Sequence, residues 1–137
     1  MYKKSLLSLC LILFFSNFAN ASKRPPFLIM GMIPHMTMQV KQNWNNEELA
    51  LNEIQKTELL KIRKETISSV MPLKKQIAPL EKEVASKILS GSKPNELLSL
   101  VNKIAALKTE ATQVHLTCVY KTQKVLSKKQ LEVLNNL

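Results

Sequence analysis

Apolar side chains recur at helical spacing through most of the chain between Leu51 and Leu126. In the first half they stand alternately three and four positions apart, at Val70, Leu73, Ile77, Leu80 and Val84. The second half continues the spacing at Leu100, Ile104, Leu107, Ala111, Val114, Cys118 and Val125. A repeat of about 3.5 residues draws one narrow stripe along a helix, as in helices buried against each other. The pattern therefore predicts two long helices.

A short break, Ser90-Gly91-Ser92-Lys93-Pro94, separates the two stripes. Gly91 can adopt the left-handed conformation that ends a helix, and Pro94 suits the first turn of the next one. So short a turn returns the second helix antiparallel to the first. The predicted fold class is therefore all-α: a long antiparallel helical hairpin with short flanking helices.

Similar capping sequences stand at the two outer ends of this hairpin. Asn52 can cap the first long helix, with Gln55 three residues later reaching back to the N–H of the cap. Ser127 and Gln130 repeat the arrangement at the start of a last short helix. We expect these four residues to form two capping boxes.

Two prolines lie inside the first long helix, where each removes a hydrogen bond and bends the helix away from itself. Pro72 and Pro79 are seven positions apart and so share one face, opposite the apolar stripe. The hairpin should therefore curve with its apolar side concave. One such hairpin has little interior, and small helical domains usually need reinforcement. We expect an intertwined homodimer.

The N-terminal residues 1–21 are typical of a signal peptide. Lys3 and Lys4 precede an apolar run, and Ala19-Asn20-Ala21 gives the small-residue cleavage pattern, so cleavage is expected after Ala21. This predicts a periplasmic protein with a flexible methionine-rich arm at residues 22–45 and a helical hairpin domain at residues 46–137. Cys118 is then the one cysteine left, which excludes an internal disulfide.

The chain is strongly basic, with 20 Lys and Arg side chains against 10 acidic ones and a formal net charge of +10. A basic surface often binds nucleic acid, but an exported protein rarely meets any. Anionic membrane surfaces, acidic partners and unfolded polypeptides are better candidates. For any single lysine, a merely solvated position is the simpler interpretation.

The arm carries four of the six methionines of the chain within residues 30–38, together with His35. Thioether sulfur and imidazole suit Cu(I) or Ag(I), so Met32, His35, Met36 and Met38 are candidate metal ligands. The alternative is an adaptable apolar segment that packs on a partner, because methionine fills irregular gaps well.

A second candidate metal site lies within the hairpin. If the hairpin pivots near Ser92, Met71 comes level with His115, and Cys118 follows His115 by one helical turn. These three side chains would form a soft site for Cu(I), Ag(I) or Zn(II). Alternatively, Cys118 is a small buried hydrophobic residue. The same His–Cys pair is the one conceivable base and nucleophile, but the sequence offers no third orienting group or oxyanion site. We therefore expect no enzyme and no required cofactor.

Two segments carry a resemblance to a known family: Leu51-Asn52-Glu53-Ile54-Gln55 and Leu126-Ser127-Lys128-Lys129-Gln130. They resemble the paired L-T-x-x-Q motifs of the Spy/CpxP family of periplasmic proteins, with asparagine and serine in place of threonine. Residues 71–80 also look like the first helix of the zinc-linked members of that family. The resemblance covers about residues 46–134.

The resemblance implies a curved dimer that holds unfolded envelope proteins without ATP during envelope stress. Some members instead bind or sense metals in metal resistance, or restrain the periplasmic domain of a sensor kinase. We thus expect a holdase-type chaperone, with metal binding or kinase regulation as alternatives. The motif residues of the family cap helices, so the resemblance assigns no client-binding residue.

Overall fold

The computed structural model describes residues 24–137, and these form an all-helical fold. Its elements are α1 (Met36–Gln42), α2 (Glu53–Leu89), the 3-10 helix η2 (Pro94–Leu97), α3 (Leu98–Val125) and α4 (Lys128–Asn135). The predicted signal peptide and its cleavage site lie outside the described residues. None of the described helices is both long and apolar enough to cross a membrane.

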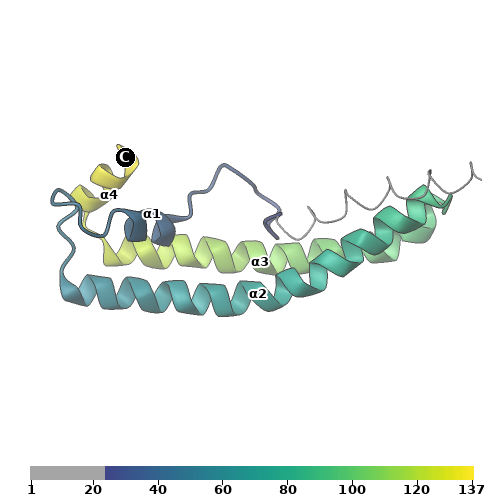
Figure 1. The fold of residues 1–137 in the computed structure, drawn as a ribbon, viewed down its shortest axis with the longest axis horizontal. Helices are drawn as coiled ribbons and strands as arrows, with labels where there is room; N and C mark the ends of the chain where they lie inside the picture. Colours follow the sequence, from purple (N-terminus) through teal and green to yellow (C-terminus); the bar gives the residue numbers. More distant parts are fainter. Residues whose placement is uncertain (1–23) are drawn as a thin grey trace, which may run out of the picture.

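The long helices α2 and α3 pack side by side as the predicted antiparallel hairpin (Figure 1). On α2 the stripe residues Leu73 and Ile77 are buried, and on α3 the stripe residues Ala111 and Cys118 are buried. Ala111 packs in one cluster with Leu73. The stripe residues nearer the turn, such as Leu100 and Ile104, are only half-buried. The periodicity therefore identified the contact face correctly, while the depth of burial falls toward the tip of the hairpin.

Helix α2 ends just before Gly91, as predicted from the position of this glycine. Gly91 has a φ of +95°, in the left-handed region where a residue with a side chain would be strained. The N–H of Ser92 donates to the carbonyl of Lys87 at 3.0 Å, and that of Gly91 to the carbonyl of Ile88 at 3.2 Å. This pair of bonds is a Schellman motif, which satisfies carbonyls that the helix end leaves free. Pro94 then begins η2, which leads directly into α3.

Helix α2 bends toward α3 partway along its length, and its second half crosses α3 (Figure 1). Pro72 and Pro79 both lie inside α2 and both are exposed, whereas Leu73 and Ile77 face the partner helix. Prolines on the solvent side leave carbonyls of the preceding turn unbonded on that side, which favours bending toward the packed face. The structure thus agrees with a curve that is concave on the apolar side.

The segment before α2 corrects one interpretation of the sequence. Residues 22–45 read as a flexible arm, but the described part of this arm contains α1 and packs along the hairpin. Met36 and Val40 of α1 are buried, and so is Phe27 further back in the chain. Seven residues are too few to show a helical period clearly, and tertiary packing rather than propensity stabilises so short a helix.

The end of the hairpin opposite the turn contains the larger hydrophobic cluster. Its buried members come from α1, α2, α4 and the connecting loops: Met36, Val40, Leu49, Leu59, Leu126 and Leu134. Trp44 and Leu131 pack against them. A smaller cluster of Phe27, Leu73 and Ala111 lies nearer the middle of the hairpin. The fold is therefore best packed where the two predicted capping sequences meet.

Both predicted capping boxes are present. The Asn52 side chain accepts from the Gln55 N–H at 2.8 Å, and Gln55 accepts in return from the Asn52 N–H at 3.2 Å. The corresponding bonds of Ser127 and Gln130 measure 3.2 and 2.9 Å. The helix starts of α2 and α4 are thus closed by the residues that the sequence indicated.

The two capping glutamines also bond to each other. Gln55 Nε2 donates to Gln130 Oε1 at 2.8 Å, and Gln130 Nε2 donates to Gln55 Oε1 at 3.1 Å. Their remaining donors reach backbone carbonyls, from Gln55 to Val125 at 3.0 Å and from Gln130 to Leu49 at 2.9 Å. We call this arrangement the glutamine clamp. It ties residues 49–55 to residues 125–130, two stretches that are distant in the sequence.

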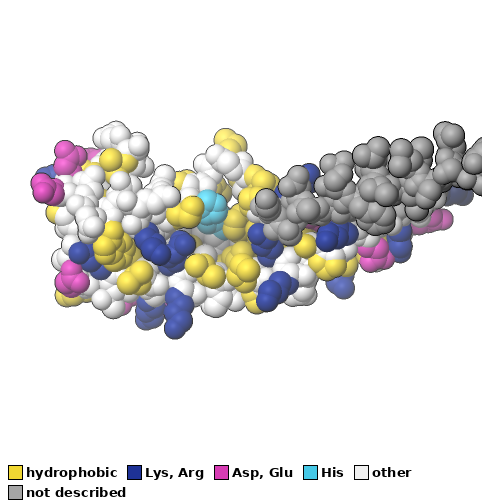
Figure 2. Space-filling view, viewed as in Figure 1, with side chains coloured by type: hydrophobic (Ala, Val, Ile, Leu, Met, Phe, Trp, Pro, Cys, Tyr) yellow, Lys and Arg dark blue, Asp and Glu magenta, His cyan; other side chains and the backbone are white. Residues whose placement is uncertain are grey.

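Charged side chains cover the outside of the hairpin. Lys108 pairs with Glu81 at 2.6 Å and Lys121 with Glu65 at 3.1 Å, each pair bridging α2 and α3. In the space-filling view, Lys and Arg are spread across the middle of the molecule, while acidic side chains gather toward the two ends (Figure 2). The middle of this face is therefore basic.

The glutamine clamp gives a first prediction. Replacing Gln130 by Ala removes the partners of the Leu49 carbonyl and the Ser127 N–H and leaves Gln55 only its bonds to Asn52 and Val125, which should lower the free energy of unfolding by about 1–3 kcal/mol. Urea denaturation would measure the loss. In a double-mutant cycle, Gln55→Ala and Gln130→Ala should couple by about 1 kcal/mol or more. Gln123→Ala, on the exposed side of α3, is the matched control. Additive effects at positions 55 and 130 would contradict the clamp.

Candidate soft-ligand pocket

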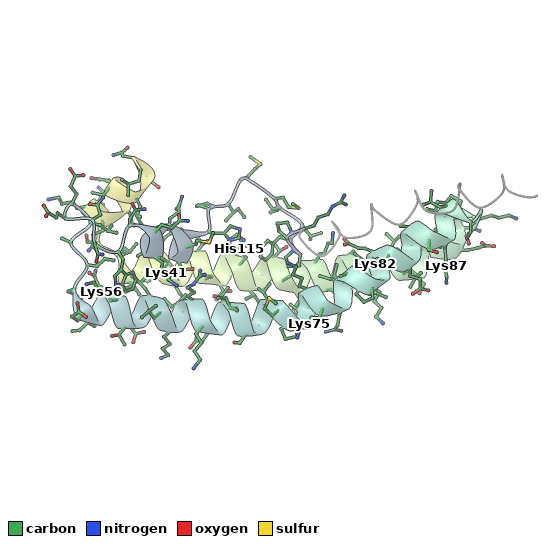
Figure 3. The ribbon with its side chains drawn as sticks, in the orientation of Figure 1. Lys41, Lys56, Lys75, Lys82, Lys87 and His115 are labelled. Atoms are coloured by element: carbon green, nitrogen blue, oxygen red, sulfur yellow. The ribbon has the colours of Figure 1, made fainter. Side chains whose placement is uncertain are left out.

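The arm and the two long helices enclose a pocket of about 180 Å³. Its walls come from the arm, from α1 and α2, and from α3. The lining residues are Phe27, His35, Thr37, Met38, Arg63, Thr66, Ile67, Val70, Met71, His115 and Cys118. Figure 3 places His115 between α3 and the chain that leads into α1. The pocket exists because the arm docks on the hairpin.

Three rings hold the arm against α3. Phe27 stacks on His115 with ring centroids 4.7 Å apart and planes 29° apart. His35 stacks on His115 from the arm, at 4.6 Å and 21°. His115 is therefore covered by two rings of the arm.

Hydrogen bonds reinforce this contact. The backbone N–H of Leu28 donates to Thr112 Oγ1 at 2.9 Å, one turn before His115 on α3. Thr37 Oγ1 and Cys118 Sγ lie 3.8 Å apart, within hydrogen-bond range for sulfur. Each contact joins the arm to the same side of α3. The arm is thus anchored before and after the stacked rings.

His115 is the most unusual polar group in the described part of the chain. Its side chain is only 4% exposed, and neither Nδ1 nor Nε2 has a hydrogen-bond partner. Burial lowers the pKa of His115 and the neighbouring His35 lowers it further, while a backbone contact with Pro34, which falls outside hydrogen-bond geometry, raises it. A buried imidazole without partners costs stability, so it calls for an explanation. At neutral pH the ring is uncharged and keeps a free lone pair.

The pocket gathers most of the candidate metal ligands. His35 and Met38 from the arm meet Met71, His115 and Cys118 from the hairpin, so the two sites proposed from the sequence share one pocket. Met32 does not take part, because it is 86% exposed. Met36 points into the main hydrophobic cluster.

The donor set of this pocket is soft. No carboxylate lines it, and the one charged lining side chain is Arg63. Within residues 24–137, no group of three or more His, Cys, Asp or Glu side chains could hold a metal ion. Thioether sulfur would therefore have to complete any ligand set, which favours Cu(I) or Ag(I) over harder cations. His115 and Cys118 are not hydrogen-bonded to each other.

A second surface feature was not recognised in the sequence. Leu60, Ile67 and Met71 are 50%, 45% and 45% exposed and stand seven and four positions apart on α2. That spacing places them on one face of the helix, outside the buried stripe. The spacing is present in the sequence, but the longer apolar repeat of the buried stripe on the same helix obscured it. We call these three residues the exposed stripe.

Comparison with protein-family models, with curated protein sequences and with solved structures gave no match.

The buried histidine gives a prediction about pH. Because the pKa of His115 is lower in the folded chain than its ordinary value of about 6.5, the unfolded chain binds more protons just below that pH. The free energy of unfolding should therefore fall as the pH drops below about 6.5. His115→Phe keeps a ring between Phe27 and His35 and should flatten this dependence.

The control is His35→Gln, which removes the neighbouring imidazole but keeps His115. Urea denaturation between pH 5 and pH 8 would compare the two variants with the parent protein. His35→Gln should retain most of the pH dependence. An unchanged slope in His115→Phe would show that another group causes the acid sensitivity.

Proposed function

We propose that this protein is a periplasmic, ATP-independent holdase of the envelope stress response, which binds unfolded proteins. The exposed stripe carries this proposal, since it presents apolar side chains beside basic ones outside the hairpin core. The predicted signal peptide and the resemblance of the two motifs to the Spy/CpxP family support the same function.

The stripe combines two kinds of contact. Leu60, Ile67 and Met71 supply apolar surface, and Arg63 and Lys64 lie between them on the same helix. Lys74 continues the face by one further turn. Figure 2 shows such a mixture, with hydrophobic and basic side chains interleaved across the middle of the molecule. Unfolded chains offer both apolar segments and acidic groups, so this surface suits many of them.

Binding by such a surface should be weak and general. The apolar side chains are separate rather than gathered in one deep pocket, so they select for no particular sequence. The charge contribution is long-ranged and falls as salt screens it. Release then needs no nucleotide, because each contact is readily lost. This behaviour defines a holdase that works by binding and release alone.

An aggregation assay would test the proposal. The protein without residues 1–21 should suppress light scattering by several unrelated unfolded proteins near stoichiometric ratio, without nucleotide and more strongly at low salt. Leu60→Gln with Ile67→Gln should weaken protection about tenfold or more, because burying each side chain contributes about 1 kcal/mol. Ile54→Gln is the matched control, since Ile54 is 78% exposed and lies on another face of α2.

Two outcomes would contradict the holdase. Equal protection by the stripe variant and the control would show that this face does not bind clients. One tight partner, with no general protection, would favour regulation of a sensor kinase through its periplasmic domain.

We propose further that two chains pair as a homodimer. Apolar side chains gather at the hairpin tip, where Ile88, Leu89, Leu98 and Val101 are all exposed. The stripe residues beneath them are only half-buried. A second chain over the tip would remove this surface from water, which is the main force in most protein association.

Sedimentation at micromolar concentration would test the pairing. The parent protein should sediment as a dimer, and Leu89→Glu with Leu98→Glu should shift it to a monomer, since like charges would meet in an apolar interface. Leu60→Gln, distant from the tip, should remain dimeric. A parent protein that is monomeric and melts cooperatively would contradict the homodimer.

A further inference from the structure

We propose that the pocket between the arm and the hairpin binds one Cu(I) ion. The ligands come from the arm and α1, from α2 and from α3. They are Met38, Met71, His115 and Cys118, all of which line the pocket. This inference goes beyond the holdase function and does not rest on it, although Met71 belongs both to the pocket and to the exposed stripe.

The unpartnered imidazole of His115 is the first observation. Buried polar groups are normally hydrogen-bonded, yet both nitrogens of His115 lack a partner while the side chain is 4% exposed. A metal ion supplies the partner that the protein does not. Burial also keeps the ring neutral, and neutral imidazole is the form that coordinates metal.

The composition of the pocket is the second observation. Sulfur-containing residues line it from three separate elements: Met38 on α1, Met71 on α2 and Cys118 on α3. Thiolate, thioether and imidazole together select Cu(I) over Mg(II), Ca(II) or Mn(II), which prefer oxygen. No carboxylate lines the pocket to offer that oxygen.

Charge favours a monovalent ion. Arg63 lines the same pocket, and its repulsion of a cation doubles when the cation carries two charges. Cys118 offsets this repulsion when it binds as a thiolate and releases its proton to solvent. Coordination of Cu(I) by the thiolate therefore leaves the ion and its ligand neutral together. Because a proton is released, the affinity should fall as the pH falls.

Binding would also fix the arm. Met38 belongs to α1, whereas Met71, His115 and Cys118 belong to the hairpin, so one ion joins the two. A ligand that binds only the folded state raises its stability. Cu(I) should therefore raise the melting temperature of the protein as well as occupy the pocket.

The experiment is an anaerobic titration with Cu(I), in competition with bicinchoninate, on the chain without residues 1–21. We expect one ion per chain and X-ray absorption that shows both sulfur and nitrogen ligands. Met38→Leu and Met71→Leu should each weaken binding at least about tenfold, the loss that even outer partners of metal ligands cause. Both side chains are partly exposed, so these variants preserve the fold, which circular dichroism would verify.

Met32→Leu is the matched control, because Met32 lies on the same arm but outside the pocket. Its affinity should equal that of the parent protein. Cys118→Ala should remove the sulfur-to-copper charge-transfer absorption. If Met32→Leu lowered the affinity for Cu(I) and Met71→Leu did not, the ion would bind on the exposed part of the arm, and the proposed site would be wrong. Tighter binding of Zn(II) than of Cu(I), or no binding, would overturn it as well.

Discussion

The glutamine clamp is the interaction on which the closed end of this fold depends. Each carboxamide uses its oxygen for the backbone N–H of its own helix cap and for the other glutamine. Each uses its nitrogen for the other glutamine and for a carbonyl of a distant segment. Glutamate lacks the donors and asparagine is shorter by one carbon, so glutamine alone fits both positions. The cap residues Asn52 and Ser127 need only accept one bond, which explains why asparagine and serine can each serve there.

The two ends of the hairpin differ in how well they are packed. Beside the glutamine clamp, the largest hydrophobic cluster is formed by α1, α2, α4 and the loops between them. At the tip, the turn is held by backbone bonds, and most apolar side chains remain exposed, although Leu97 is buried. Local opening is easiest where few apolar contacts are buried. The tip is therefore the part of the described chain that gains most from a second copy.

The helix ends and bends could be predicted from the sequence because residues within or next to each helix determine them. Gly91, the prolines of α2 and both capping boxes act on backbone within a few positions, so their roles could be inferred locally. The docking of the arm could not, because α1 is too short to show a period and is anchored by residues far away in the chain. Phe27 against His115 and Leu28 against Thr112 are such contacts. For the same reason two separate sets of candidate ligands were predicted where the fold forms one pocket.

Ile67 and Met71 connect the two proposals, because both line the pocket and both belong to the exposed stripe. An ion that draws the Met71 thioether inward removes one apolar side chain from the surface offered to clients. Thermodynamic linkage then requires the reverse effect. A client that holds Met71 outward must lower the affinity for the ion by the same factor. Of the three stripe residues, Leu60 lies outside the pocket and Ile67 is not a ligand. The coupling free energy is therefore limited to what Met71 contributes to the binding of the ion or of the client. A chain with both properties would therefore show modest, reciprocal antagonism between copper and unfolded protein, and Met71→Leu would abolish it while leaving the apolar stripe intact.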